Sequence, residues 1–161
     1  MQLESWVKRL LISSTFAQAT MYVIRPFITY RAIEINAGAT AIGLIGALYA
    51  LFPVLLALKF GSWVGKFGEG KFIVIGTSAL ILSSTALIFS RDLITLAVST
   101  AFAGLAHLGL MVGGQTMVAL RAPKSDYNRL FGYYTFSASL GQMIGPLTAG
   151  FVAGSLANGL P

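Results

Sequence analysis

The sequence has no cysteine, which excludes a disulfide framework and any metal site built on thiolates. A single histidine is present, so a cluster of imidazole ligands is excluded as well. The acidic residues number five, and each falls in a predicted terminus or loop: Glu4, Glu34, Glu69, Asp92 and Asp126. The sequence therefore predicts no metal, no cofactor and no carboxylate inside an apolar segment.

Signatures of enzymes are also missing. The sequence has no nucleotide-binding loop, no HExxH motif and no nucleophile with a base at a suitable spacing. The formal net charge of +6 comes from 11 basic residues spread among short loops, whereas nucleic-acid binding favours a clustered basic surface. We therefore expect neither an enzyme nor a nucleic-acid partner.

Long apolar segments dominate what is present. Hydrophobic residues make up 56% of the chain and charged residues 10%, which is typical of polytopic membrane proteins. A helix needs about 20 apolar residues to cross a hydrocarbon core of about 30 Å. We predict an all-α integral membrane protein with one transmembrane domain over residues 1–161 and five spans, at approximately 10–30, 41–60, 72–89, 93–120 and 130–154. The fourth uncharged run would be about 42 Å long as one helix, so it predicts either tilt or a break at Gly113-Gly114.

The basic residues predict the orientation of the spans. Eight of them lie at the N-terminus or in the second-to-third and fourth-to-fifth loops, whereas Arg31 and Arg91 lie on the opposite side. The positive-inside rule then puts the N-terminus in the cytoplasm. We expect the membrane to be the plasma (inner) membrane. A cleaved signal peptide is the alternative for the N-terminus, since Ala17-Gln18-Ala19 has the small-x-small form, but the preceding apolar run is short.

The fifth segment has two faces of small residues. At 100° per residue, Ser137, Gly141, Gly145 and Thr148 share one side, and Ser139, Gly150 and Gly154 share nearly the opposite one. Both sides contain a GxxxG pair, which lets helix backbones approach closely in lipid. We expect two close neighbours, and a bend at Pro146.

The spacing of this segment also resembles a known motif. Gly132, Gly141, Gly145-Pro146 and Ala149-Gly150 are spaced as in the fifth-helix motif of major facilitator superfamily transporters, which ends Gly-Pro-x-x-Gly-Gly. Here Ala149 replaces the first of the last two glycines. The motif is best known in exporters of the family, so the resemblance implies antiporter-like efflux. Small-residue packing in an unrelated bundle is the alternative.

A glycine-rich and lysine-rich turn is expected over residues 61–71. It resembles the family's loop between helices two and three, Gly-x-x-x-Asp-Arg/Lys-x-Gly-Arg/Lys-Arg/Lys, and Gly61, Lys66 and Gly68 match in register. Gly65 stands where the family has its aspartate, and Glu69 and Gly70 stand where it has two basic residues, with Lys71 one residue late. In the family these charges help to lock the two halves in one conformation, so the departures put that latch in doubt. Any positive cytoplasmic turn would look similar.

The first span carries a polar stripe. Five side chains fall within an arc of about 80°, namely Ser14, Gln18, Tyr22, Arg25 and Thr29. Polar groups facing lipid are costly, so the stripe is expected to face a water-filled cavity or other helices, and these residues are our candidates for the substrate pathway. Arg25 would contact an anionic or polar substrate group; alternatively, its guanidinium extends outward to the headgroups.

His107 lies near the middle of the fourth span and is a possible proton site, because its ordinary pKa lies near physiological pH. The alternative is a neutral histidine that is hydrogen-bonded across helices. Members of the family often have an arginine four residues before a glycine in this helix. Here Thr100 precedes Gly104, which weakens any assignment of that basic group.

The resemblance implies two six-helix halves with the substrate between them, and this chain would supply helices one to five of the N-terminal half. The expected function is secondary active transport of a small molecule by alternating access, as efflux. The expected partners are the lipid bilayer, the substrate and the C-terminal half of the same chain. A small assembly protein that binds partner helices through its glycine faces is the alternative. A further seven spans beyond Pro161 would favour the transporter, and a natural stop codon there would favour the assembly role.

Overall fold

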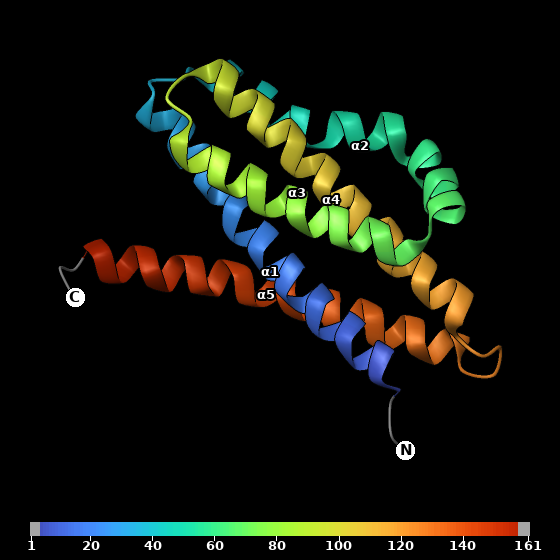
Figure 1. Cartoon of the computed structure of the whole chain (residues 1–161). Helices are drawn as coiled ribbons and strands as arrows, with labels where there is room; N and C mark the ends of the chain where they lie inside the picture. Colours follow the sequence, from blue (N-terminus) through green and yellow to red (C-terminus); the bar gives the residue numbers. More distant parts are fainter. Residues whose placement is uncertain (1–3, 158–161) are drawn as a thin grey trace. The chain divides into compact units, whose positions relative to one another are not determined.

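The computed structural model describes residues 4–157 and contains five helices in that range, with no strand (Figure 1). They are α1 (Ser5–Glu34), α2 (Ala39–Phe67), α3 (Glu69–Phe89), α4 (Leu93–Arg121) and α5 (Tyr127–Ala157). Each helix contains one of the five predicted spans, so the all-α prediction is confirmed.

Three helices, α2, α3 and α4, are long and apolar enough to cross a membrane. Their outward surfaces carry large apolar side chains; in α2, Leu58 is 91% exposed and Val54 is 74% exposed. Apolar surface of this extent is stable in hydrocarbon, where helices satisfy their backbone hydrogen bonds internally. The prediction of a polytopic membrane protein is confirmed.

The chain divides into two compact units. The first contains residues up to Arg25 together with those from Pro123 onward, and therefore includes most of α1 and all of α5. The second runs from Pro26 to Ala122 and includes the end of α1 with α2, α3 and α4. The boundary lies inside α1, between Arg25 and Pro26. The single transmembrane domain expected over residues 1–161 stays a prediction.

In the second unit, α4 packs against both α2 and α3. Glycines allow these contacts, because a Cβ on Gly104 would collide with the backbone carbonyl of Tyr49 in α2. On the α3 side, a Cβ on Gly76 would lie 2.9 Å from Cγ of Leu110. Apolar side chains complete the buried face of α4: Leu96, Ala103, Ala106, Leu110 and Val118.

The turn is much shorter than the one expected over residues 61–71, so that prediction is wrong in its bounds. Helix α2 continues through Gly61, Gly65 and Lys66 to Phe67, and the chain reverses at Gly68 alone, whose φ is +94°. Val64 is fully buried, so packing holds the last turns of α2 helical despite the low helix propensity of their glycines. A side chain at Gly68 would be strained, and this is the one position of the motif where the turn requires glycine. Lys71 belongs to the first turn of α3.

The break considered at Gly113-Gly114 is also wrong, because α4 is one helix of 29 residues. Both glycines are buried. A Cβ on Gly113 would lie 3.1 Å from Cγ1 of Ile73 and 3.3 Å from the carbonyl oxygen of Glu69. Gly113 therefore brings α4 close to α3, and the helix continues through both glycines. Prolines 26, 53 and 146 likewise lie inside helices, and α2 is visibly bent in Figure 1.

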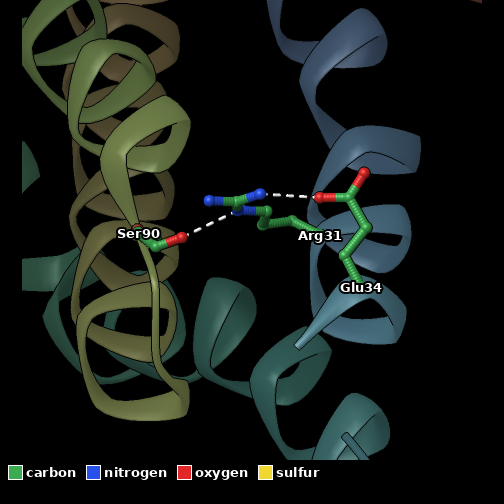
Figure 2. Close-up of polar contacts among 3 residues, drawn as sticks. All are labelled: Arg31, Glu34 and Ser90. Carbon is green, nitrogen blue, oxygen red and sulfur yellow. Dashed lines mark hydrogen bonds and ion pairs between the residues drawn. The ribbon is translucent and has the colours of Figure 1, made fainter. Parts of the chain in front are cut away.

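In the second unit, Arg31 joins the end of α1 to the end of α3 (Figure 2). Its Nε donates to the carbonyl oxygen of Ser90 at 2.7 Å, and its Nη1 lies 2.7 Å from Oε2 of Glu34. The end of α1 is thereby held against the turn between α3 and α4. After α1 the chain turns at Asn36, which has φ of +58° and tolerates this conformation better than most residues.

Asp92 begins α4. Its Oδ1 accepts hydrogen bonds from the backbone amides of Ile94 and Thr95, both at 2.9 Å, as expected of an N-cap. The hydrogen bond from the Thr95 amide lowers the pKa of the Asp92 carboxyl below its ordinary value, with further help from the Thr95 hydroxyl and the Ile94 amide. Asp92, which we expected in a loop, therefore also starts the next helix.

Candidate functional site

In the first unit, α1 and α5 cross (Figure 1), and the contact is made by the Gly141/Gly145 face. A Cβ on Gly141 would collide with the carbonyl oxygen of Thr15. One on Gly145 would lie 2.6 Å from the carbonyl oxygen of Ala19. Two backbones are therefore in direct contact, and the prediction of a close neighbour on this face is confirmed.

A hydrogen bond accompanies the glycine contact. The hydroxyl of Thr15 lies 3.0 Å from the carbonyl oxygen of Leu11 on its own helix and 3.0 Å from that of Ser137 on α5. Ser137 in turn donates its hydroxyl to the carbonyl of Tyr134 at 2.7 Å. The Thr15 hydroxyl thereby links α1 to α5, and a hydrogen bond between helices is favourable at membrane depth.

The second small-residue face of α5 is bare within the described chain. A Cβ built on Gly150 or Gly154 meets nothing within 4 Å, and the same holds for Gly132. The second close neighbour therefore stays a prediction. The fifth-helix motif is divided between a packed part, at Gly141 and Gly145, and an unoccupied part around Gly150.

The polar stripe of α1 changes its surroundings along the helix. Ser14 and Gln18 are buried, Tyr22 is half-buried, and Arg25 and Thr29 are exposed. A Cβ built on Gly141 would lie 2.8 Å from Cβ of Gln18, and one built on Gly145 would lie 2.9 Å from Cβ of Tyr22. The inner part of the stripe thus packs on α5, as the expectation of a helix neighbour allowed. Whether the stripe forms the substrate pathway stays a prediction.

Arg25 and Tyr22 form a pair in the part of the stripe that lies toward the C-terminal end of α1. The guanidinium carbon of Arg25 lies 4.8 Å from the centroid of the Tyr22 ring, which is a cation–π geometry. One face of the guanidinium is thus covered by an aromatic ring while the residue as a whole remains exposed. Thr29 lies beyond the unit boundary and belongs to the second unit.

His107 is hydrogen-bonded across helices. Its Nδ1 lies 2.6 Å from the phenolic oxygen of Tyr49 on α2, and the two ring centroids are 6.1 Å apart. This matches the alternative of a histidine bonded to a neighbouring helix, and it leaves a proton role open as a prediction. Our sequence reasoning missed Tyr49. The available signal was weak, since Tyr49 is the one residue with a polar side chain between Ala41 and Leu58.

The turn between α2 and α3 carries an ion pair that the sequence reasoning also missed. Nη2 of Arg121, the last residue of α4, lies 2.6 Å from Oε1 of Glu69, and its Nε donates to the same oxygen at 2.8 Å. Glu69 precedes the predicted span. Hydrogen bonding to its own backbone amide and then to Arg121 lowers the pKa of its carboxyl. The acid that departs from the loop pattern is therefore paired with a base on α4.

Comparison with known proteins bears out the family resemblance. The sequence model described as Major Facilitator Superfamily matches residues 10–158. Multidrug resistance protein 1 of Bacillus subtilis (strain 168) is 27% identical over 120 residues, 74% of this chain and 31% of that protein. The multi-drug resistance efflux pump PmrA homolog of Lactococcus lactis subsp. lactis (strain IL1403) is 24% identical over 149 residues, 90% of this chain and 37% of that protein.

A third relative, Multidrug resistance protein 2 of Bacillus subtilis (strain 168), is 28% identical over 117 residues, 71% of this chain and 29% of that protein. The chain therefore spans about a third of the length of the curated relatives that it matches. No solved structure matches it.

Proposed function

The chain belongs to the Major Facilitator Superfamily, and from this premise we propose that it forms part of a secondary transporter that exports small molecules by alternating access. The observation that carries the proposal is the family match over residues 10–158, which includes the glycine-proline motif of α5. Relatives named as multidrug resistance and efflux proteins support export. Proteins of this family are transporters, and the chain is not an enzyme.

The remaining helices of the transporter are part of the proposal. The curated relatives are about three times as long as the matched region, which supports a second half packed against this one. The partners are then the bilayer, a small-molecule substrate and that second half. The biased distribution of lysine and arginine supports a cytoplasmic N-terminus in a plasma membrane.

The substrate pathway is proposed along the outer part of the α1 stripe. Arg25 offers an exposed cation whose position is supported by the ring of Tyr22. An anionic or polar group of a substrate would bind the guanidinium while an apolar part contacts the aromatic ring. Gln18, one turn below Tyr22, supplies amide groups beside the crossing with α5. His107 is proposed as the proton site.

The experiment measures dye efflux in cells that lack their own drug exporters and express this chain in its genomic reading frame. Expression is expected to lower dye accumulation, and dissipating the proton gradient is expected to restore it. Arg25→Ala should reduce efflux about two- to fivefold, the value of one exposed cationic contact of about 0.5 to 1 kcal/mol. Arg91→Ala is the matched control, because it removes an exposed arginine from an outer turn. Unchanged accumulation on expression would refute transport, and full activity of both Arg25→Ala and Gln18→Ala would refute the pathway.

The bare Gly150/Gly154 face supports one alternative, a small assembly protein that binds a partner helix there. In that case Gly150→Leu would release a co-purifying membrane protein, and no dye would be exported by the parent chain. A transporter instead predicts that the parent exports dye.

A further inference from the structure

The pair formed by Tyr49 and His107 joins the middle of α2 to the middle of α4. Its hydrogen bond, 2.6 Å from the phenolic oxygen to Nδ1, lies beside a close helix crossing, because the backbone of Tyr49 is against Gly104. Gly104 is three residues before His107 and therefore on a neighbouring part of the same helix face. Both side chains of the pair are half-buried. The geometry is thus set by two packed helices and not by a loop.

The pair lies far from the other charges of its unit. Lys59 is ten residues from Tyr49 along α2, about 15 Å. His107 is 14 residues from Arg121 and 15 from Asp92, each about 21 Å or more. The other charged or titratable groups on the helices and turns packed around the pair lie near the ends of the predicted spans: Tyr30, Arg31, Glu34, Lys59, Lys66, Glu69, Lys71, Arg91, Asp92 and Arg121.

We propose that Tyr49 is the positioning residue of His107, fixing the neutral imidazole with its proton on Nε2 and reversing their shared hydrogen bond when the imidazole takes up a second proton. The inference rests on the proposed function, in which His107 carries the coupling proton. A phenol in an apolar span needs an acceptor for its O–H, and the neutral imidazole offers one acceptor nitrogen. Donation from the Tyr49 hydroxyl to Nδ1 satisfies both groups and leaves the imidazole proton on Nε2.

Protonation changes the direction of this bond. Hydronium from the solvent gives its proton to Nδ1 and leaves as water, so the imidazolium has two N–H donors and no acceptor. The phenol keeps its own proton, turns, and accepts a charge-assisted hydrogen bond from Nδ1–H. Its O–H is then directed to a different acceptor. Proton uptake by His107 on α4 thereby redirects the O–H of Tyr49 on α2 to a new acceptor, beside the place where the two backbones touch.

Nitrogen NMR tests the positioning role without any transport. His107 is the single histidine of the chain, so ¹⁵N-histidine labelling in lipid nanodiscs, with a tag free of histidine, gives one pair of imidazole signals. At alkaline pH the parent chain is expected to have Nε2 protonated and Nδ1 unprotonated. Tyr49→Phe keeps the ring and removes the hydroxyl, and should give a mixture of both tautomers. Tyr30→Phe removes an exposed phenol and should leave the parent spectrum unchanged.

Identical imidazole signals in the parent and in Tyr49→Phe, or a neutral parent with its proton on Nδ1, would overturn the proposal. The pH profile of dye efflux is the second readout. Loss of the phenol acceptor is expected to displace the profile of Tyr49→Phe toward lower pH by about half a unit, with Tyr30→Phe unmoved. If the parent exports no dye, the proposed function fails while the NMR result stands. If dye is exported and the tautomer is unaffected by Tyr49→Phe, the present inference alone fails.

Discussion

Replacement of Gly145 by alanine tests the glycine contact between α1 and α5. A Cβ there would lie 2.6 Å from the carbonyl oxygen of Ala19, 2.9 Å from Cβ of Tyr22 and 3.2 Å from the amide nitrogen of Val23. Ordinary van der Waals contact begins near 3.4 Å, so the helices must separate by about half an ångström or more. Two of the three atoms are backbone and cannot rotate away. Overpacking of this kind costs about 1 to 3 kcal/mol.

Gly150→Ala is the matched control on the same helix, because its Cβ meets nothing within 4 Å. Alanine has the higher helix propensity by about 1 kcal/mol, so the control should be neutral or slightly stabilised. The assay is the free energy of unfolding, measured by titrating sodium dodecyl sulfate into mixed micelles and following helicity. If Gly145→Ala is as stable as Gly150→Ala, the close crossing of α1 and α5 is refuted.

Three further predictions concern the ends of α3 and α4. Glu69→Arg places two cations together and should destabilise the second unit by about 0.5 to 1 kcal/mol, since Arg121 is half-exposed. Adding Arg121→Glu should recover the loss. Thermal unfolding of both variants checks this, and no recovery would refute the pairing. The pKa of Asp92 is lower in the folded chain than in the unfolded chain. The stabilisation that the ionised Asp92 gives is therefore present above the ordinary carboxyl pKa and is lost as the pH falls through the lowered pKa. Asp92→Asn keeps a cap and should lose this part of the pH dependence of unfolding. Gly68→Ala should cost about 1 to 3 kcal/mol in the same unfolding assay through its φ of +94°, whereas Gly65→Ala, inside α2, should not destabilise the chain.

Composition and periodicity were sufficient for the helices. Five apolar segments predicted five helices, and the GxxxG pair at Gly141 and Gly145 predicted a helix neighbour, because small residues in lipid have few other uses. The ends of the helices were less predictable. Glycines 61 and 65 suggested a long turn, but burial of Val64 favours a continued helix, and this tertiary contact is not visible in local sequence.

The contacts that individual side chains make with other helices could not be predicted. His107 and Glu69 were both noticed, but Tyr49 is 58 residues from His107, and Arg121 is 52 residues from Glu69. Their pairing depends on how α4 is rotated and shifted against α2 and α3. That register is set by Gly104, Gly76 and Gly113 together, through contacts that periodicity along one helix does not contain.

Cysteine accessibility tests the central claim, that the chain crosses the membrane repeatedly with its turns on alternating sides. The parent chain has no cysteine, so single cysteines at Asn36, between α1 and α2, and at Ser125, between α4 and α5, report without background. In intact cells an impermeant maleimide should label Asn36→Cys and should label Ser125→Cys only after the membrane is permeabilised. Equal labelling of both cysteines before permeabilisation would contradict the account.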